Sequence, residues 1–365
     1  MIVSVNLGSH SYSIVVEAGA LAGVGERLRA LGVGRRAALV TDAAIIRLPY
    51  PAAVVESLER AGFSVTVIEV PEGEAAKTLT VAEHCWDRLL AAGLDRTSTV
   101  LGLGGGAVGD LAGFVSATYM RGTNFVTLPT TVLAQVDASI GGKTAIDHPK
   151  AKNLVGAFHQ PRLVIVDPVV VRTLPEREFR SGLAEIVKHG AVLDRPYFEE
   201  VERDAPRLLA RELEVVDRII GGSCRLKAGV IERDPEEKSE LRFALNYGHT
   251  IGHALEAATG YERWTHGEAV ALGIVAEARL ACRLGVASEA VARRQERLLA
   301  AVGLPTRAGR LDAEAVLDAM THDKKARDGR VPFVLAPDLG QFRVVYDVAP
   351  DAIRLTLGEL VGEDA

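Results

Sequence analysis

Strand and helix patterns alternate along the first half of the chain, and no other feature of the sequence limits the fold as strongly. Short runs rich in apolar and β-branched residues are typical of buried strands, and longer amphipathic segments are typical of helices. The strand patterns lie at 36–42, 63–70, 98–106, 124–129 and 162–168, and the helical patterns between them lie at 52–62 and 80–93. Strands that are joined through helices run parallel, so the pattern predicts a parallel sheet with helices on both faces.

The pattern changes after Pro175. Helical periodicity dominates from there, at 176–194, 211–232, 249–259, 266–284, 289–302 and 312–320, and the segments 331–337 and 341–348 indicate one late hairpin. We therefore predict an α/β domain over residues 1–174, followed by a mainly α-helical domain over residues 175–365. A chain of 365 residues is long for a single core, which agrees with two domains. A cleft between two such domains is a usual place for a small-molecule site.

Composition and charge exclude several classes of protein. The net charge of −6 gives no general electrostatic reason to bind nucleic acid. No apolar run reaches the roughly 20 residues of a membrane-spanning helix, and the first residues lack the basic and apolar regions of a signal peptide. The three cysteines are odd in number, far apart and outside any CxxC pattern, which disfavours a disulfide framework or a thiolate zinc site. We expect a soluble cytoplasmic protein without nucleic-acid or membrane partners.

A glycine-rich segment, LGLGGGAVGD at 101–110, follows a strand pattern and opens a helix. Glycines let the backbone approach a phosphate, and the N–H groups of a helix N-terminus bind it. The segment fits GxGxxA, although it is not in the first βα unit and lacks the usual acidic residue downstream. Taken alone, it fits equally well a tight turn that needs small residues for packing. Thr130 and Thr131, whose hydroxyls follow a second strand pattern, favour phosphate binding.

Glu185, His249 and His266 are the residues best suited to hold a divalent cation. One carboxylate and two imidazoles, with positions left open for substrate oxygens, form a common catalytic metal site. His253 follows His249 by one helical turn, so these two could also form a ligand pair, but the glutamate of the HExxH pattern is absent. Any single histidine is more often a helix cap or a hydrogen-bonding group of the core. Three of the nine histidines fall within 18 residues, which favours a site.

Basic residues recur beside glycines or in other special contexts. Lysine and arginine bind phosphate and carboxylate groups well, although most lysines are solvated surface residues. Lys143, in SIGGKTAID, is the strongest candidate, because the two glycines before it indicate backbone folded closely around a charge. SIGGKT is not a Walker A loop, since Ala138 stands where that loop needs glycine, and this disfavours ATP hydrolysis. The other candidates are Arg121, Lys152, Lys227, Arg242, Lys324 and Lys325.

Taken together, these motifs resemble the 3-dehydroquinate synthase family over nearly the whole chain. The residues that carry the resemblance are PEGEAAK (71–77), GGGAVGDLAGF (104–114), YMRG (119–122), LPTTVLAQVDASIGGKTAIDHPKAKNLVGAFHQP (128–161), RTLPEREFRSGLAEIVKHG (172–190), ALNYGHTIGHALE (244–256) and THGEAVALG (265–273). The resemblance implies a Rossmann-like N-terminal domain, a helical C-terminal domain and an NAD-binding cleft between them. It also implies a zinc or cobalt ion and a homodimer. The implied sugar-phosphate substrate is 3-deoxy-D-arabino-heptulosonate 7-phosphate, which the shikimate pathway converts into 3-dehydroquinate and phosphate.

The resemblance also assigns residues by motif. Glu185, His249 and His266 match the metal ligands. The NAD contacts match Asp42, Glu72, Gly73, Glu74, Lys77, Gly105, Gly106, Ala107, Val108, Gly109, Asp110, Thr130, Thr131, Asp137, Lys143, Lys152 and Thr173. The active-site positions match Arg121, Lys143, Asn153, Lys188, Lys227, Glu237, Arg242, Asn246, His253, Lys324 and Lys325, and in a dimer Arg121 reaches the site of the neighbouring subunit. The chain departs from the family at two places. Ala44 replaces an asparagine that is common in the family. The stretch 234–242 is one residue longer than usual, so the acidic active-site residue is either Glu237 or Glu236.

The reaction that the resemblance implies has five steps: oxidation, phosphate elimination, reduction, ring opening and aldol closure. NAD first takes a hydride, so that a ketone acidifies the neighbouring carbon, and later returns it. The cation lowers the pKa of the hydroxyl that is oxidised, and His253 relays protons beside it. The alternatives are a valiolone- or inosose-type cyclase of secondary metabolism and a metal-dependent polyol dehydrogenase. A catalytically inactive regulator is disfavoured, because all three ligand positions are filled.

Overall fold

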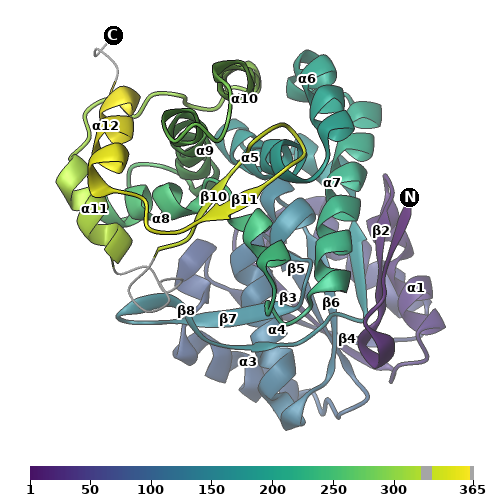
Figure 1. The fold of residues 1–365 in the computed structure, drawn as a ribbon. Coiled ribbons are helices and arrows are strands. Elements are labelled where there is room, and N and C mark those ends of the chain that lie inside the picture. Colours follow the sequence, from purple (N-terminus) through teal and green to yellow (C-terminus); the bar gives the residue numbers. More distant parts are fainter. Residues whose placement is uncertain (322–330, 362–365) are drawn as a thin grey trace. The chain divides into compact units, whose positions relative to one another are not determined.

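A seven-stranded sheet lies at the centre of Met1–Leu174, the first of the two units into which the chain divides (Figure 1). The structure is a computed structural model that describes residues 1–321 and 331–361. The strands, in their order across the sheet, are β1 (Ile2–Val5), β2 (Tyr12–Val16), β9 (Leu163–Val166), β6 (Asn124–Pro129), β5 (Thr99–Gly104), β3 (Arg36–Asp42) and β4 (Ser64–Val70). Every neighbouring pair is parallel except β1–β2, so the predicted parallel sheet is confirmed, with one antiparallel strand at its edge.

Helices cover both faces of this sheet, as the alternating pattern predicted. On one face lie α1 (Val24–Ala30) and α2 (Pro49–Arg60), and on the other lie α3 (Leu79–Ala91) and α4 (Gly106–Thr118). Successive side chains of a strand point to opposite faces, so Leu39 of β3 packs with the first pair of helices and Val40 with the second. The central strands are therefore buried on both faces, which explains their continuous apolar runs.

The order of the strands reverses between β3 and β5. From β3 the chain moves outward to β4 at one edge, then returns past β3 to β5 and continues to β6 on the other side. In such sheets, ligands bind outside the carboxyl ends of the strands at this reversal. β3 ends at Asp42 and β5 ends at Gly104, and the register pairs Thr41 with Leu103 directly before them. The fold therefore places two of the predicted cofactor-binding segments side by side.

A two-stranded hairpin of the first unit, β7 (Lys143–His148) with β8 (Ala151–Phe158), was not predicted from strand patterns. It packs on α4, where Gly113 leaves room: a Cβ at this glycine would lie 2.3 Å from Cγ2 of Thr144. A short π-helix, Ala134–Ala138, precedes the hairpin. The glycines and polar residues of this segment hide the period of two on which strand prediction depends.

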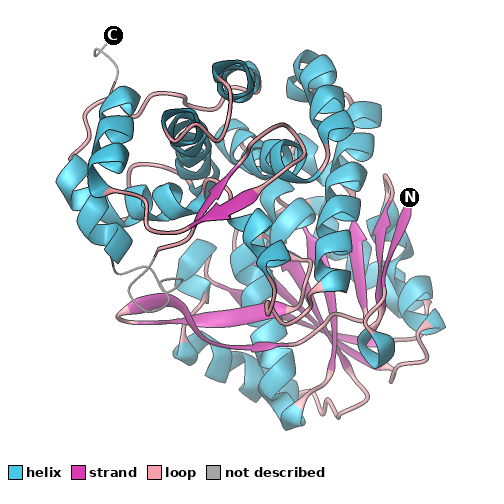
Figure 2. Ribbon diagram, viewed as in Figure 1, coloured by secondary structure: helices cyan, strands magenta, loops and turns pink. Residues whose placement is uncertain are grey.

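Helices make up most of the second unit, Pro175–Ala365 (Figure 2). They are α5 (Glu176–Leu193), α6 (Arg195–Leu209), α7 (Leu213–Arg233), α8 (His249–Ala258), α9 (His266–Arg283), α10 (Glu289–Ala301), α11 (Ala313–Thr321) and α12 (Pro350–Leu360), with the antiparallel pair β10 (Phe333–Leu335) and β11 (Arg343–Val345). All six predicted helical segments and the late hairpin are confirmed, whereas α6 and α12 were missed. Within the described ranges, no helix has both the length and the apolar character needed to cross a bilayer.

Glycines bring three helices of this unit into backbone contact. A Cβ at Gly267 would lie 1.8 Å from the backbone O of Ser181, so the start of α9 touches α5. A Cβ at Gly273 would lie 1.9 Å from the backbone O of Gly248, so α9 also touches the residue before α8. Because only glycine lacks a Cβ, these positions determine how closely the three helices approach.

Candidate functional site

The glycine-rich segment forms the turn between β5 and α4. A Cβ at Gly102 would lie 2.9 Å from Cβ of Ala112, and a Cβ at Gly104 would lie 2.7 Å from Cβ of Val108. These two glycines therefore serve the packing of α4 on β5, which is one of the two interpretations that the sequence allowed. The residue before α4 is Gly105, which has no side chain to cap the helix. The first N–H groups of α4 are thus available to an anion, as the other interpretation requires.

Hydroxyl and carboxylate groups from neighbouring strands lie beside this turn. Thr130 and Thr131 directly follow β6, and a Cβ at Gly105 would lie 3.3 Å from Cγ2 of Thr131. The Oγ1 of Thr130 is buried and has no hydrogen-bonding partner among the described residues, while Oγ1 of Thr131 accepts from the N–H of Ala134 at 3.1 Å. At the end of β3, Oδ1 of Asp42 accepts from the N–H groups two and three residues later, at 2.9 and 2.8 Å. The turn is therefore flanked by a free hydroxyl and an oriented carboxylate.

Other predicted residues of the first unit lie mostly at its surface. Gly141 and Gly142 have positive φ angles of 106° and 67°, so the backbone before Lys143 is tightly folded as expected. Lys143 itself, however, is exposed and is not enclosed by that backbone. The hydroxyl of Thr173 lies 2.9 Å from that of Tyr50. Of the others, Asp137 is half-buried, and Glu72, Gly73, Glu74, Arg121, Lys152 and Asn153 are exposed.

Lys77 differs from these cations, because its side chain is only 2% exposed. Its Nζ donates to Oδ2 of Asp110 at 2.8 Å and to Oδ1 of Asn153. Carboxylate oxygens of Glu74 and Asp147 lie 3.7 and 4.0 Å away. Burial alone would lower the pKa of Lys77, but the surrounding carboxylates, Asp110 above all, raise it. The ammonium is therefore charged at neutral pH and is bound by other groups of the protein.

In the second unit, α5 carries the carboxylate of the predicted metal site. Glu185 is fully buried, and within the described part of the chain neither of its oxygens accepts a hydrogen bond of regular geometry. Lys188, one turn later, forms an ion pair with Glu185 and donates from Nζ to the backbone O of Leu245 at 2.8 Å. Burial by itself would raise the pKa of Glu185, but the charges of Lys188 and of two imidazoles hold it well below its usual range.

Two imidazoles lie beside this carboxylate, and a third lies beside those two. The Nε2 atoms of His249 and His266 lie 3.5 and 3.7 Å from Oε1 of Glu185. The ring centroids of His249, His253 and His266 lie 5.1 to 5.8 Å apart, and one nitrogen from each ring falls within 4.8 Å of the others. The predicted ligands Glu185, His249 and His266 thus converge at one place within the second unit. His253, which forms the alternative ligand pair with His249, lies at the same place.

Two of these rings are oriented through their other nitrogen. Nδ1 of His249 lies 3.0 Å from the backbone O of Tyr247, and Nδ1 of His266 lies 3.3 Å from Oε2 of Glu256. Both contacts are satisfied when the proton is on Nδ1, which leaves Nε2 as the ligand atom, as is usual for metal-binding imidazoles. Burial would lower the pKa of His266, but the contacts of its ring with Glu185 and Glu256 and the charges of these carboxylates raise it to about 10. The carboxylates of Glu185 and Glu256 therefore favour a positive charge between them.

Arg242, one of the predicted active-site cations of the second unit, is buried. Its Nη2 lies 2.6 Å from Oε1 of Glu237, whereas its Nε and Nη1 have no hydrogen-bonding partner among the described residues. Glu236 instead pairs with the exposed Lys238, so the structure favours Glu237 of the two carboxylates that the sequence left open. Of the remaining predicted residues, Lys227 on α7 is buried, Asn246 at the end of η8 (Glu240–Asn246) is half-buried, and Lys324 and Lys325 lie outside the described residues.

Two glutamates of this site were missed by the sequence analysis. Glu256 contacts the imidazole of His266, as described above. Glu277 on α9 is fully buried, and its carboxylate accepts from the N–H of Gly248 at 2.7 Å and from the N–H of Ile251 at 3.4 Å, at the start of α8. A signal existed for Glu277, because it is the first acidic residue after a long apolar run (269–276), on the buried side of a helix. Glu256 has no comparable signal, because an acidic residue near a helix end is usually solvated.

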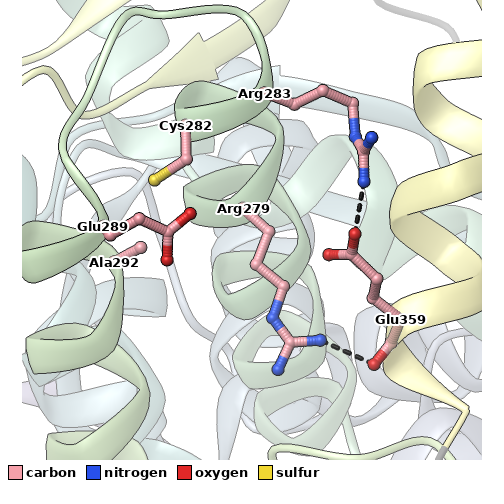
Figure 3. A pocket seen from close by; sticks show the side chains of 6 residues that line it. All are labelled: Arg279, Cys282, Arg283, Glu289, Ala292 and Glu359. Carbon is pink, nitrogen blue, oxygen red and sulfur yellow. Dashed lines mark hydrogen bonds and ion pairs between the residues drawn. The ribbon is translucent and has the colours of Figure 1, made fainter.

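A pocket of about 280 Å³ lies elsewhere in the second unit, among residues of α9, α10 and α12 (Figure 3). Its lining residues are Arg279, Cys282, Arg283, Glu289, Ala292 and Glu359. Arg279 donates to the backbone O of Glu359 at 2.6 Å, and Arg283 forms an ion pair with the carboxylate of the same residue. Arg279 also forms an ion pair with Glu296 at 2.9 Å, so both positive charges are already compensated, and none of the predicted site residues lines this pocket.

Comparison with known proteins identifies the family. The family models described as 3-dehydroquinate synthase N-terminal and 3-dehydroquinate synthase C-terminal match residues 67–181 and 182–326. The 3-dehydroquinate synthase of Geobacter metallireducens is 48% identical over 342 residues, 94% of each chain, and that of Desulforamulus reducens is 44% identical over 358 residues, 98% of this chain and 99% of the relative. The solved structure of the 2-epi-5-epi-valiolone synthase of Streptomyces hygroscopicus, with NAD+ and Zn2+ bound, has a TM-score of 0.87 at 27% identity and covers 96% of each chain. The chain belongs to the 3-dehydroquinate synthase family.

Proposed function

We propose that this chain catalyses the 3-dehydroquinate synthase reaction, the conversion of 3-deoxy-D-arabino-heptulosonate 7-phosphate into 3-dehydroquinate and phosphate. NAD and one zinc or cobalt ion serve as cofactors. The observation that carries this proposal is the convergence of Glu185, His249 and His266 on one buried place in a chain of this family. The chemistry of each group of residues supports it as follows.

The residues of the second unit fit a divalent cation. A buried, ionised carboxylate that has no regular hydrogen bond needs positive charge beside it, and among the described residues Glu185 is such a group. The Nε2 atoms of His249 and His266 face the same carboxylate oxygen, while their Nδ1 atoms are engaged elsewhere. We assign these three residues as ligands, a nitrogen and oxygen set that suits zinc and cobalt. His253, whose ring lies 5.1 Å from that of His249, is then left to carry protons.

The residues of the first unit fit NAD. The N–H groups at the start of α4 suit a pyrophosphate, and the hydroxyl of Thr130, which has no partner in the described part of the chain, is a further donor beside them. Asp42, oriented at the end of β3, suits a ribose hydroxyl. When bound, NAD takes and returns a hydride, and the divalent cation stabilises negative charge on substrate oxygens.

The chain's own side chains bind the substrate and move its protons. Arg242 has two guanidinium nitrogens without a protein partner in the described structure, and a substrate carboxylate or phosphate can bind there. Lys188 is held by Glu185 and by the backbone O of Leu245, so its charge stays in one place. The imidazole of His253, whose ring centroid lies 5.1 Å from that of His249, is placed to relay protons. Lys143 at the start of β7 acts as an electrostatic clamp for an anionic substrate group.

We propose a cytoplasmic homodimer, formed through the first unit. Leu154 and Phe158 of β8 and Met120 of η5 (Tyr119–Arg121) are large apolar residues that are about half exposed or more. Exposed apolar groups of this size often mark an interface. Arg121, next to Met120, would then approach the site of the neighbouring subunit. Among the described residues, the three cysteines form no disulfide, which agrees with a reducing compartment.

A valiolone-type cyclase is the second candidate, because the valiolone synthase compared above shares the fold over 96% of each chain. A metal-dependent polyol dehydrogenase is a third. One assay separates the three: the purified protein is given heptulosonate phosphate, trace NAD and zinc or cobalt. Phosphate release in large excess over NAD, without net NADH, is the expected result. Stoichiometric NADH would indicate the dehydrogenase. No turnover of this substrate would refute the proposed reaction and favour the sister cyclase.

A further inference from the structure

The first turn of α9 contacts α5 through the buried hydroxyl of Ser181. Its Oγ accepts from the N–H of Gly267 at 3.1 Å. Gly267 is the second residue of α9, and the first four N–H groups of a helix have no acceptor within that helix. A Cβ at Gly267 would lie 1.8 Å from the backbone O of Ser181. Ser181 thus accepts from one of these N–H groups at the point where α9 lies closest to α5.

An ion pair one helical turn earlier on α5 holds the same turn of α9. Nε and Nη2 of Arg177 donate to the two carboxylate oxygens of Glu268, at 2.9 and 2.7 Å. The carboxylate of Glu268 also accepts from the N–H of Thr265, the N-cap of α9, at 2.8 Å, as part of a capping box. A bidentate contact of this kind constrains angle as well as distance. Arg177 therefore holds the residues with which α9 begins.

These two contacts and the proposed metal site form one row along α5. Positions 177, 181 and 185 are four apart, so their side chains are neighbours on the helix surface. They contact residues 268, 267 and 266 of α9, in that order. The imidazole of His266 is oriented by Glu256 of α8, but the backbone of His266 is placed beside Glu185 by the contacts of the two residues that follow it.

We propose that Ser181 and Arg177 are positioning residues for metal binding, which hold the first turn of α9 on α5 so that the imidazole of His266 meets the carboxylate of Glu185. The proposal rests on the proposed function for the assignment of His266 and Glu185 as metal ligands. Ligand atoms must be held within about 0.5 Å of the binding geometry. Loss of either contact lets the start of α9 move away from α5, and the consequence is a lower metal affinity.

Ser57 of the first unit offers a matched control for Ser181. Its Oγ accepts from the N–H of Gly25 at 3.1 Å, and Gly25 is the second residue of α1. A Cβ at Gly25 would lie 2.0 Å from the backbone O of Ser57. Both serines therefore make the same contact with the start of a helix, but only Ser181 makes it with a helix that carries a proposed metal ligand. If these contacts served the fold alone, Ser57→Ala and Ser181→Ala would have the same effect on metal binding.

Zinc affinity and the spectrum of bound cobalt test the role of Ser181. Ser181→Ala should raise the Kd of zinc by on the order of tenfold in competition with a chromophoric chelator, as expected when a buried N–H loses its acceptor. It should also change the visible absorption of the cobalt-loaded protein, which reports the ligand geometry. Ser57→Ala should lower the Tm but leave the zinc affinity and the cobalt spectrum unchanged. Wild-type zinc affinity in a folded Ser181→Ala protein, or an equal loss of affinity in Ser57→Ala, would overturn the proposal.

The ion pair is tested at Arg177, whose side chain is 57% exposed, so this variant replaces Ser181→Ala if the latter does not fold. Arg177→Met should raise the Kd of zinc by about twofold to fivefold, because an exposed ion pair is weaker than a buried hydrogen bond. Arg177→Lys keeps the charge but not the bidentate contact and should give an intermediate Kd. Combined with Glu268→Gln, the loss of affinity should be smaller than the sum of the two single losses. Additive losses would overturn the role of Arg177.

Hydrogen exchange of the metal-free protein separates this proposal from the proposed function. Ser181→Ala should increase the exchange of the amides of residues 267–270 by on the order of tenfold, whereas Ser57→Ala should leave these amides unchanged. If the wild type binds neither zinc nor cobalt, the proposed function fails, and the exchange experiment still decides whether Ser181 holds the first turn of α9. Wild-type exchange of these amides in Ser181→Ala would show that it does not.

Discussion

Glu277→Gln should weaken metal binding in a protein that still folds. Glu277 is fully buried on α9, and its carboxylate accepts from two N–H groups at the start of α8, those of Gly248 and Ile251. The first residue of α8 is the proposed ligand His249, and the first residue of α9 is the proposed ligand His266. Glu277 on α9, the helix that begins with His266, therefore holds the start of α8, the helix that begins with His249.

The size of the effect follows from these two contacts. Glutamine keeps one acceptor oxygen, so the 2.7 Å bond from Gly248 loses its charge assistance, which is worth about 1 kcal/mol. The 3.4 Å bond from Ile251 is weak, and its loss costs roughly another 1 kcal/mol. Loss of the negative charge at the N-terminus of α8 adds ~0.3–1 kcal/mol. The free energy of unfolding should fall by about 2–3 kcal/mol, and the protein remains folded if its stability is in the usual range of ~5–15 kcal/mol.

Urea unfolding and a chelator competition measure the two consequences separately. Unfolding followed by circular dichroism gives the stability, and competition with a chromophoric chelator gives the zinc affinity of the folded protein. The affinity should fall by about tenfold, because a displaced α8 moves His249 away from Glu185. Glu289→Gln, at an exposed residue of α10, is the control and should change neither quantity. A loss of stability with wild-type zinc affinity, or a stability within about 0.5 kcal/mol of the wild type, would refute the reasoning.

Three further predictions follow from single contacts. Glu256→Gln should lower zinc affinity by about tenfold with little change in Tm, measured by the same chelator competition, because it weakens the contact that orients a ligand imidazole. Burial raises the pKa of Cys85 and of Cys224 to about 12, so a thiol reagent at neutral pH should modify at most one of the three cysteines in the native protein and all three in urea. Gly273→Ala should destabilise the protein by more than about 2 kcal/mol in urea unfolding and reduce zinc binding, because its Cβ would lie 1.9 Å from a backbone oxygen before α8. Gly229→Ala on α7, where a Cβ meets nothing within 4 Å, should instead be neutral or stabilise the protein by up to ~1 kcal/mol.

The parallel sheet and the helices could be predicted because their signals are local and periodic. β3 and β5 are apolar runs that end at Asp42 and Gly104, and β6 is followed directly by Thr130; the topology gathers the predicted cofactor residues at these strand ends. His249 and His266 could be predicted as a site because they cluster in the sequence and begin successive helices. Glu185 is distant in sequence from both and no spacing links it to them; it was chosen as the carboxylate that such a ligand set needs, and the resemblance to a family assigned it the same role.

The rest could not be predicted because it depends on contacts between distant segments. The β7–β8 hairpin is held by a lysine some 70 residues earlier in the chain, and no periodicity shows such a tie. Gly102 and Gly104 matched a phosphate-binding pattern, but they serve the packing of α4, because a missing Cβ suits either purpose. Glu277 lies 29 residues from the amide that it accepts from, and its role is visible only when α8 and α9 are placed together.

Lys77 and Glu277 point to a common physical reason for these buried charges. Each is almost or wholly buried, and each hydrogen-bonds to a different element of its own unit. A well-packed apolar residue can often replace a buried charge with little loss of stability, so stability alone does not account for either residue. An apolar contact, however, does not specify direction, whereas a hydrogen bond to a charged group constrains both distance and angle. In the second unit, then, the buried charge of Glu277, which is not one of the proposed metal ligands, controls where the ligand His249 lies, and this predicts that its loss lowers metal affinity as well as stability.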